Sequence, residues 1–210
     1  GETVTCTFHN ERERGTLIVE KITDDGNGAF DYTSSSLDPA SFTLTTTAAG
    51  DAGKDSRSFS DILAGTYDVA ETVPAGWNLV SSTCDDGSPV TAIDLSDGET
   101  VTCTFHNARQ RGAILIQKVR KHAADGPGDH AQAGVDFTVT GGSLPAGGVD
   151  VTTDSLGLAC VDNVVLSSLA GDYAVEETVP AGYHAAGATT KNVTVVAEGT
   201  CSAGPYANVS

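Results

Sequence analysis

The chain contains one short sequence twice. Residues 1–15 read GETVTCTFHNERERG, and residues 98–112 read GETVTCTFHNARQRG. The copies are identical up to the Asn and differ only in the short linker that follows it. An internal repeat of this kind indicates an array of similar modules, each built on one structural unit. The second copy closes a complete module, so we expect the first copy to be the closing segment of another module.

The repeat also divides the 210 residues into modules. Two modules of roughly a hundred residues each agree with the usual size of a small domain. We expect the closing strand to complete a sandwich outside both modules, in the same polypeptide or in another subunit. The expected segments are a closing strand at residues 1–10, a linker at 11–14, module 1 at 15–107, a linker at 108–111 and module 2 at 112–210.

The pattern of apolar residues indicates β-structure throughout. Five short stretches alternate apolar and polar residues with the period of a β-strand, and they begin at Phe42, Val101, Val135, Val149 and Val193. Clusters of Asp and Gly separate such stretches, as expected for turns. No stretch has a convincing helical period. Many short strands within each module predict an all-β fold of immunoglobulin-like sandwiches.

The charge of the chain excludes two classes of partner. The sequence has 28 acidic and 11 basic residues and a formal net charge of −17. A nucleic-acid-binding protein needs a basic face toward the phosphates, and this chain has none. An anionic membrane surface is disfavoured for the same reason. No apolar run is long enough to cross a bilayer, so we expect no membrane insertion in this segment.

The five cysteines suggest two disulfides and one unpaired thiol. The sequence spacing pairs Cys84 with Cys103 and Cys160 with Cys201, and it leaves Cys6 with a partner outside this segment. Neither a CxxC motif nor a Cys/His cluster is present, so we expect no metal ion and no cofactor. Paired cysteines in small β-modules indicate an oxidising, extracellular setting. The alternative is a set of buried free thiols.

Three polar residue types recur at equivalent places in the two modules. A Lys ends the first strand, a Glu follows a Tyr-containing strand, and an Asn lies at the end of the module. Side chains two residues apart point to the same face of a strand, so each of these groups shares a face with apolar core residues. Glu176 has the opposite parity and is expected to face water. The recurring residues are Lys21, Glu71 and Asn107 in module 1 and Lys118, Glu177 and Asn208 in module 2.

These three residue types can form an amide bond between two side chains. Burial lowers the pKa of a Lys and makes its amine a nucleophile. The Asn carboxamide offers an electrophilic carbon, and the Glu can carry protons while ammonia leaves. The reaction occurs once per module, so it is self-modification and not enzymatic turnover. Two plainer readings remain open, a solvated Lys and a buried salt bridge without a bond.

The turn that follows each Glu carries a family resemblance. The sequences ETVPAGW from Glu71 and ETVPAGY from Glu177, together with the Lys and Asn strands, resemble the CnaB-type, SpaA-like (prealbumin-like) domains of bacterial surface proteins. The resemblance covers essentially the whole chain and implies seven-stranded sandwiches with intramolecular Lys–Asn isopeptide bonds. Module 2 departs from the pattern, because the interval from Cys201 to Asn208 is three residues longer than that from Cys103 to Asn107.

The resemblance implies an extracellular structural protein of the cell surface, within a repetitive stalk or filament. Its expected partners are neighbouring modules or subunits of the same protein, and a single-chain array is favoured over a filament. Asn10 and Cys6 should then face a Lys and a Cys equivalent to Lys21 and Cys84. The alternative is an adhesin module that binds an unknown host or surface ligand. An ordinary enzyme is a third possibility, but no Ser/His/Asp, metal or phosphate motif supports it.

Overall fold

The computed structural model describes residues 1–121, 128–168 and 171–201. The chain forms two compact units, unit 1 at Gly1–Arg109 and unit 2 at Gln110–Ser210, and each is described by itself. Both units consist of β-strands, as the sequence predicts. The predicted all-β fold with tandem domains is therefore confirmed.

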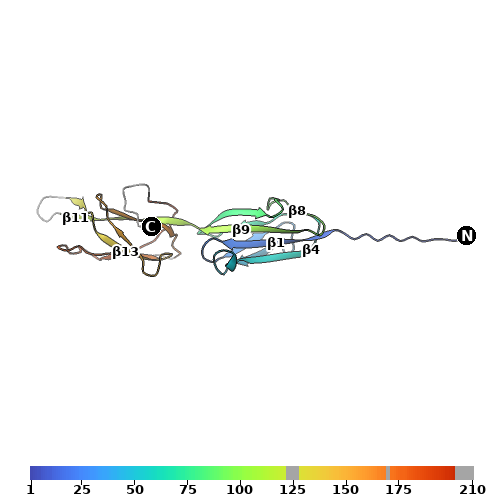
Figure 1. The fold of residues 1–210 in the computed structure, drawn as a ribbon, viewed down its shortest axis with the longest axis horizontal. Coiled ribbons are helices and arrows are strands. Elements are labelled where there is room, and N and C mark those ends of the chain that lie inside the picture. Colours follow the sequence, from blue (N-terminus) through green and yellow to red (C-terminus); the bar gives the residue numbers. More distant parts are fainter. Residues whose placement is uncertain (122–127, 169–170, 202–210) are drawn as a thin grey trace. The chain divides into compact units, whose positions relative to one another are not determined.

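Unit 1 contains nine strands and one short 3-10 helix, and two of its sheets form a sandwich (Figure 1). One sheet has the order β4-β1-β9-β7, the facing sheet has the order β3-β2-β6, and β5 pairs with β8. The strands are β1 (Arg14–Thr23), β2 (Ala29–Thr33), β3 (Ser41–Thr45), β4 (Asp55–Leu63), β5 (Gly65–Tyr67), β6 (Ala70–Thr72), β7 (Trp77–Cys84), β8 (Ile93–Leu95) and β9 (Thr100–Arg109), and the 3-10 helix is η1 (Asp51–Gly53).

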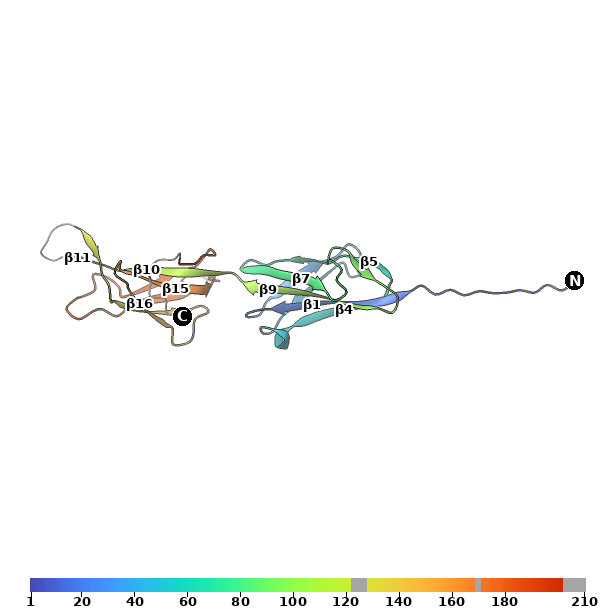
Figure 2. The same ribbon diagram turned by 45° about the horizontal axis from the view of Figure 1, so that its top comes forward.

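The first and last strands of unit 1 lie side by side in the centre of the larger sheet (Figure 2). β1 and β9 run parallel, with Val19 opposite Cys103 and Lys21 opposite Phe105. β4 pairs antiparallel with the outer edge of β1, and β7 pairs antiparallel with the outer edge of β9. Because inward residues alternate with outward ones along both strands, Lys21 points into the core.

The core of unit 1 is dominated by aromatic and branched side chains from both sheets. The ring of Tyr32 stacks on Phe42 at a centroid distance of 5.1 Å and meets Phe105 edge-on at 5.2 Å. Phe30 and Trp77 form another edge-on pair at 5.1 Å. The Tyr32–Phe105 and Phe30–Trp77 contacts join the two sheets, whereas Tyr32 and Phe42 are neighbours within one sheet. The buried aromatic area between the sheets holds them together.

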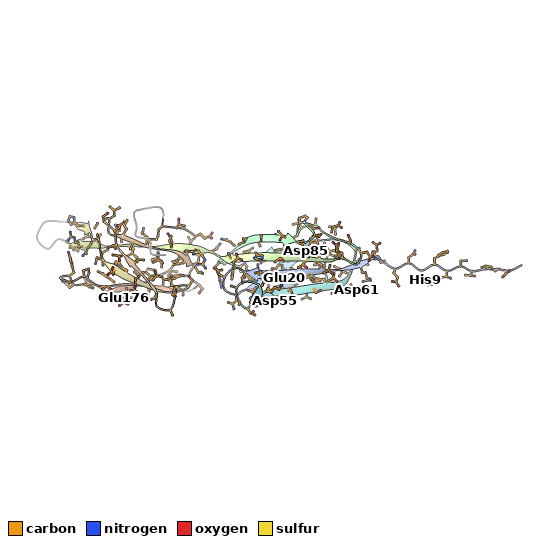
Figure 3. The ribbon with its side chains drawn as sticks, in the orientation of Figure 1. His9, Glu20, Asp55, Asp61, Asp85 and Glu176 are labelled. Carbon is orange, nitrogen blue, oxygen red and sulfur yellow. A yellow bond between two sulfur atoms is a disulfide. The ribbon has the colours of Figure 1, made fainter. Side chains whose placement is uncertain are left out.

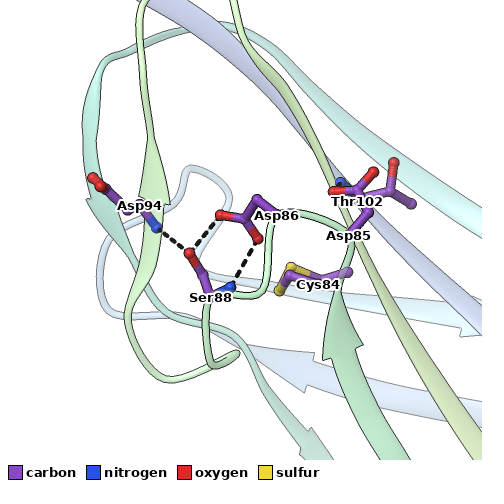
Figure 4. The surroundings of a disulfide bond; sticks show 7 residues. Cys84, Asp85, Asp86, Ser88, Asp94 and Thr102 are labelled. Atoms are coloured by element: carbon purple, nitrogen blue, oxygen red, sulfur yellow. Dashed lines mark hydrogen bonds between the residues drawn. A yellow bond between two sulfur atoms is a disulfide. The ribbon is translucent and has the colours of Figure 1, made fainter.

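A disulfide joins two neighbouring strands of the larger sheet (Figure 4). Cys84 and Cys103 are direct cross-strand partners in β7 and β9, which explains their short Cα–Cα distance of 3.9 Å. The chain then enters an Asp-rich turn. The backbone N–H of Thr102 donates to Asp85 Oδ1 at 2.9 Å, and Asp86 accepts a hydrogen bond from the backbone N–H of Ser88 at 3.0 Å. The acidic turn residues are thus satisfied by local hydrogen bonds.

Unit 2 repeats this plan in its described residues. β10 pairs antiparallel with β15, β11 pairs with β12, and the facing sheet has the order β14-β13-β16-β17 (Figures 1 and 2). A second disulfide joins Cys160 to Cys201 with a Cα–Cα distance of 6.3 Å. The strands are β10 (Arg111–Gln117), β11 (Val119–Lys121), β12 (Asp129–Ala131), β13 (Asp136–Gly141), β14 (Val149–Thr152), β15 (Leu158–Val165), β16 (Tyr173–Glu177) and β17 (Thr190–Val193).

The strand segments of unit 1 outnumber the seven expected from the resemblance. β5 and β6 are two parts of one extended segment that is interrupted at Asp68 and Val69. At the interruption, Asp68 accepts hydrogen bonds from the hydroxyl groups of Ser35 and Ser36, each at 2.7 Å, and the Val69 N–H donates to Val90 O at 2.8 Å. Side-chain hydrogen bonds from residues distant in the sequence here replace the regular ladder.

The segment expected to link the two modules is mostly β-structure. β9 continues to Arg109, and β10 begins at Arg111. β9 extends beyond Asn107 because Trp77 and Asn78 of β7 still pair with Arg109 and Ala108. Arg109 is further held by its guanidinium, which lies 4.0 Å from the centre of the Trp77 ring. Residues 108–111 are therefore not a free spacer.

Candidate functional site

The two sheets of unit 1 bring the three recurring residues together. Lys21 lies on β1, and Asn107 lies on the adjacent strand β9. Glu71 lies on β6 in the facing sheet. The predicted set is therefore assembled across the interior of the sandwich, from three segments that are far apart in the sequence.

The Lys21 amine is the centre of this cluster. Its Nζ lies 3.0 Å from Glu71 Oε1 and donates a hydrogen bond to Asn107 Oδ1. A weaker contact runs to the backbone carbonyl of Phe105 at 3.3 Å. The amine also lies 4.2 Å from the centre of the Phe30 ring. Amine, carboxylate and carboxamide thus meet in one place.

Burial sets the protonation chemistry of the cluster. The side chains of Lys21 and Glu71 are 0% and 1% exposed, and Asn107 is fully buried. Removal from water lowers the pKa of Lys21 because burial penalises the ammonium, although Glu71 acts in the opposite direction. A neutral Lys amine is a nucleophile.

Two buried polar atoms of the cluster have no hydrogen-bond partner among the described residues. They are Glu71 Oε2 and Asn107 Nδ2. An unsatisfied buried polar atom costs about 1–3 kcal/mol, and such atoms are rare enough to require an explanation. Loss of Asn107 Nδ2 as ammonia would remove one of them. The amine, the carboxylate and the carboxamide of the cluster are close enough together for a reaction between them.

Sequence reasoning did not identify two aromatic residues of the site. The Tyr32 hydroxyl donates to Glu71 Oε1 at 3.4 Å, and burial, followed by the Glu71 charge, raises the pKa of Tyr32 above its usual value. Phe30 covers the amine, as described above. Both lie on the inward face of β2, and both are fully buried. Their alternation in the sequence AFDYT could have placed them in the core, but nothing there links them to Lys21.

Unit 2 holds the corresponding Lys–Glu pair in a wetter place. Lys118 Nζ lies 2.7 Å from Glu177 Oε1, and the two side chains are 21% and 14% exposed. Glu177 ends β16, and Lys118 directly follows β10. Asn208 lies outside the described residues. Glu176 is exposed, as its parity predicts (Figure 3).

A groove of about 320 Å³ runs beside β10 and contains this ion pair. Among the described residues, β10 pairs with β15 alone, whereas β1 has a strand on each side. The apolar side chains that line the groove are Ile114, Leu115, Ile116, Val119, Phe137, Val175, Ala188 and Val193. The groove therefore lies along the edge of β10 and has a mixed lining, with the ion pair and Lys191 among its polar side chains.

The remaining predicted site residues lie at the beginning of the chain. Residues 1–10 are described, form no strand and are exposed throughout. Cys6 is a free, exposed thiol. Asn10 is likewise exposed, so no residue of unit 1 contacts it in the manner of Asn107.

One grouping of side chains has the composition of a metal site. Cys160, Asp162 and Cys201 lie close together. Both sulfur atoms are joined to each other in the disulfide, and Asp162 Oδ1 accepts a hydrogen bond from the Cys201 N–H at 2.7 Å. Only a single carboxylate would remain as a ligand, so this grouping does not fit a metal ion.

Comparison with protein families gives two matches. Both family models are of the SpaA type and are described as prealbumin-like fold domains. One matches residues 17–109, and the other matches residues 113–208. A comparison with curated proteins gives no match.

Comparison with solved structures also gives matches. The Bacillus anthracis TIE protein has a TM-score of 0.54 and 24% identity, over 90% of this chain and 33% of the other. The chain thus spans about a third of that protein. GBS52, the minor pilin of Streptococcus agalactiae, has a TM-score of 0.36 and 16% identity, over 87% of this chain and 92% of the other. The major pilin from Streptococcus pyogenes has a TM-score of 0.38 and 14% identity, over 81% and 83%.

Within the described residues, no helix has both the length and the apolar character needed to cross a membrane.

Proposed function

Because the chain belongs to the family of SpaA-type prealbumin-like fold domains, we propose that it is a structural module of a bacterial surface stalk or filament. Each sandwich in this proposal is closed by a self-formed amide bond between a Lys on its first strand and an Asn on its last. The bonds would be Lys21–Asn107 in unit 1 and Lys118–Asn208 in unit 2.

A single observation carries the proposal for unit 1. Lys21, Glu71 and Asn107 form a dry cluster in which the amine contacts both the carboxylate and the carboxamide. A plain salt bridge needs no Asn at this position and would leave the carboxamide nitrogen unsatisfied. The cluster is better explained as an arrangement for condensation.

The residues supply each part of the reaction. The neutral Lys21 amine attacks Asn107 Cγ, and a new Nζ–Cγ bond forms. Glu71 takes a proton from the attacking amine and delivers it to Asn107 Nδ2. The Cγ–Nδ2 bond then breaks, and ammonia leaves. The product is a secondary amide between neighbouring strands, formed once and without turnover.

A backbone hydrogen bond near the start of each unit supports the same bond in unit 2. In unit 1 the Gly98 N–H donates to Arg14 O at 2.7 Å, and in unit 2 the Gly199 N–H donates to Arg111 O at 3.3 Å. The interval from Gly98 to Asn107 equals that from Gly199 to Asn208. Counted along the sequence from this shared hydrogen bond, Asn208 stands at the same distance as Asn107. On this count the longer interval after Cys201 comes from the position of the cysteine and not from that of the asparagine.

A mechanical role follows from the position of the bond. β1 and β9 are the first and last strands of unit 1, and a bond between them closes almost the whole unit into a ring. Force applied along the chain would then pass through the bond and leave the loops unloaded. The pilins among the structural matches fit such a role at the cell surface. A ligand-binding adhesin would instead need a hollow that stays open, and the β10 groove is the place where the closing segment of unit 2 would lie.

Intact mass is the direct test. The folded chain should be lighter than its sequence by the mass of two ammonia molecules, one for each unit. Peptide mapping should recover Lys21 and Asn107 in one branched peptide. A Glu71→Gln variant should lose only one ammonia molecule, because unit 1 no longer condenses. The Glu176→Gln variant, which changes an exposed carboxylate, should still lose two. Recovery of unmodified Lys21 and Asn107 peptides from the folded protein would falsify the proposal for unit 1.

A further inference from the structure

Residues 1–10 have the sequence of a central strand but no strand beside them. They read GETVTCTFHN, as residues 98–107 do. In unit 1 the second copy forms most of β9 and pairs with β1 on one side and β7 on the other. In the first copy Val4 is 75% exposed and Phe8 is 88% exposed, and Figure 1 draws no strand there.

The exposed face of this segment is the one that β9 buries. Val101 and Phe105, the equivalents of Val4 and Phe8, are 0% and 1% exposed. Burial of such apolar side chains is a main source of stability in a sandwich. A bare apolar strand is also prone to aggregate. The sequence of residues 1–10 is therefore suited to a covered position that unit 1 does not provide.

Unit 1 cannot provide that position because the connection is too short. β1 begins at Arg14, so three residues separate Asn10 from it. Three residues span about 10 Å, whereas a strand parallel to β1 would have to return along roughly 30 Å. Parallel neighbours need a crossover of a dozen or more residues. Both edges of β1 are also occupied, by β4 and β9.

We propose that residues 1–10 dock as the parallel closing strand of another β-sandwich built like unit 1. The partner presents a first strand with a Lys at the position of Lys21 and a Glu on its facing sheet. It also presents a Cys at the position of Cys84. Asn10 then lies against that Lys, and Cys6 lies opposite that Cys, as Cys103 lies opposite Cys84.

The covalent part of the docking rests on the chemistry proposed for unit 1. The partner's Lys amine attacks Asn10 Cγ, the Nζ–Cγ bond forms, and Asn10 Nδ2 leaves as ammonia. The Cys6 thiol and the partner's thiol lose two protons and two electrons to a disulfide oxidant. Docking itself needs neither step, so strand addition and bond formation can be measured separately.

A mixing experiment tests docking between two full chains. The acceptor carries Val101→Asp and Phe105→Asp, which spoil the buried face of its own β9, and Asn10→Ala. The donor is the unchanged chain, and the two are refolded together with oxidised glutathione. We expect a two-chain adduct that survives reduction and boiling, with Asn10 of the donor joined to Lys21 of the acceptor. Donor Phe8→Asp should abolish it, whereas donor His9→Gln, at the outward position labelled in Figure 3, should not.

A fusion keeps the test decisive if that acceptor fails to fold. In this fusion, residues 15–97 are placed directly before residue 1 of the full chain. Asp97 is then followed by Gly1, just as it is followed by Gly98 in unit 1. Residues 1–10 should then become protected from amide hydrogen exchange, and the chain should lose one further ammonia. Protection without the loss would uphold docking and refute the bond chemistry. Unprotected residues 1–10 in the fusion, or a donor adduct on Lys118, would overturn the proposal.

Discussion

The two units hold the same ion pair in different surroundings. In unit 1 the Lys21–Glu71 pair is 3.0 Å apart and dry, with Asn107 against the amine. In unit 2 the Lys118–Glu177 pair is 2.7 Å apart but 21% and 14% exposed, at a groove along the edge of β10. The same ion pair is therefore found in a dry place in unit 1 and in a partly exposed place in unit 2.

The framework around the two pairs is shared. The Tyr67 hydroxyl donates to Leu63 O at 2.6 Å, and the Tyr173 hydroxyl donates to Val165 O at 2.6 Å. In each unit a Tyr thus fixes the start of the segment that leads to the Glu. In unit 1 the last strand, β9, also lies beside β1, and it carries Asn107. The shared Tyr contacts and the shared ion pair show that the two units hold their Lys–Glu pairs on a similar framework.

The largest expected effect is the loss of the Lys21–Asn107 bond. In a Glu71→Gln variant the bond should not form. A cross-link that closes a loop of this length stabilises by about 4–5 kcal/mol on the chain-entropy account used for disulfides. For a domain of this size the melting temperature of unit 1 should fall by roughly 20 °C. Calorimetry with Glu176→Gln as the control measures this, and an unchanged transition would show that neither an amide bond nor the ion pair stabilises unit 1.

Loss of a disulfide should give the next largest decrease in stability, and the size of the decrease should differ between the two units. The Cys84–Cys103 loop spans 19 residues, and the Cys160–Cys201 loop spans 41. Replacing Cys84 and Cys103 by serines should lower the free energy of unfolding by about 3 kcal/mol, and replacing Cys160 and Cys201 should lower it by about 4 kcal/mol. Both values are upper bounds where an amide bond already closes the same unit.

Replacing Cys160 and Cys201 should also hinder the ammonia loss in unit 2, because Cys201 precedes the segment that carries Asn208. Intact mass of the two serine variants checks this, and equal ammonia loss in both would argue against the proposed register.

Much of the fold was predictable from the sequence because β-structure has a simple period. Alternation along residues 101–107 correctly placed Val101, Cys103, Phe105 and Asn107 on one buried face. The spacing of the cysteines also indicated the two pairs that the structure contains. The strand count was not predictable, because β5 and β6 are separated by hydrogen bonds from Ser35 and Ser36, residues distant in the sequence.

The site was predictable as a set of residues but not as an environment. Lys21 could be assigned to the first strand of the module and Asn107 to the last from their order in the sequence, whereas the pairing of these two strands comes from the structure. The contacts of Tyr32 and Phe30 could not, because they depend on how the second sheet faces the first. The exposure of the Lys118–Glu177 pair was equally hidden, since its parity matches that of the buried pair in unit 1. Periodicity predicts which face a side chain takes, and packing decides how dry that face is.

A smaller effect is expected from the hydroxyl that contacts Glu71. Tyr32→Phe removes the hydrogen bond to Glu71 Oε1 and keeps the stacked ring. A typical hydrogen bond contributes about 1 kcal/mol, so the Lys21–Asn107 amide bond should still form in this variant. Ammonia should be lost more slowly once newly made chain is refolded. Tyr67→Phe is the matched control, because its hydroxyl bonds to Leu63 O and not to the cluster. Equal rates in the two variants would show that Tyr32 has no part in positioning the carboxylate.

The smallest effect is a pH dependence that appears only when the bond is absent. In an Asn107→Ala variant the Lys21 amine stays free, and burial lowers its pKa in the folded state. At pH values between that lowered pKa and the ordinary Lys pKa near 10.4, the unfolded chain binds more protons than the folded chain. The free energy of unfolding should therefore rise as the pH increases from neutral toward about 9.5. Above that range the raised pKa of folded Tyr32 acts in the opposite direction, because the unfolded Tyr ionises near 10.

Denaturant unfolding of the Asn107→Ala variant across this pH range checks the sign of the change. Lys21→Met in the same Asn107→Ala background removes the titrating amine and should flatten the curve. The unaltered chain should be as flat, because the proposed bond turns its Lys21 nitrogen into an amide. A rise of the same slope in all three proteins would assign the effect to other groups and would remove the support that burial gives to a nucleophilic Lys21.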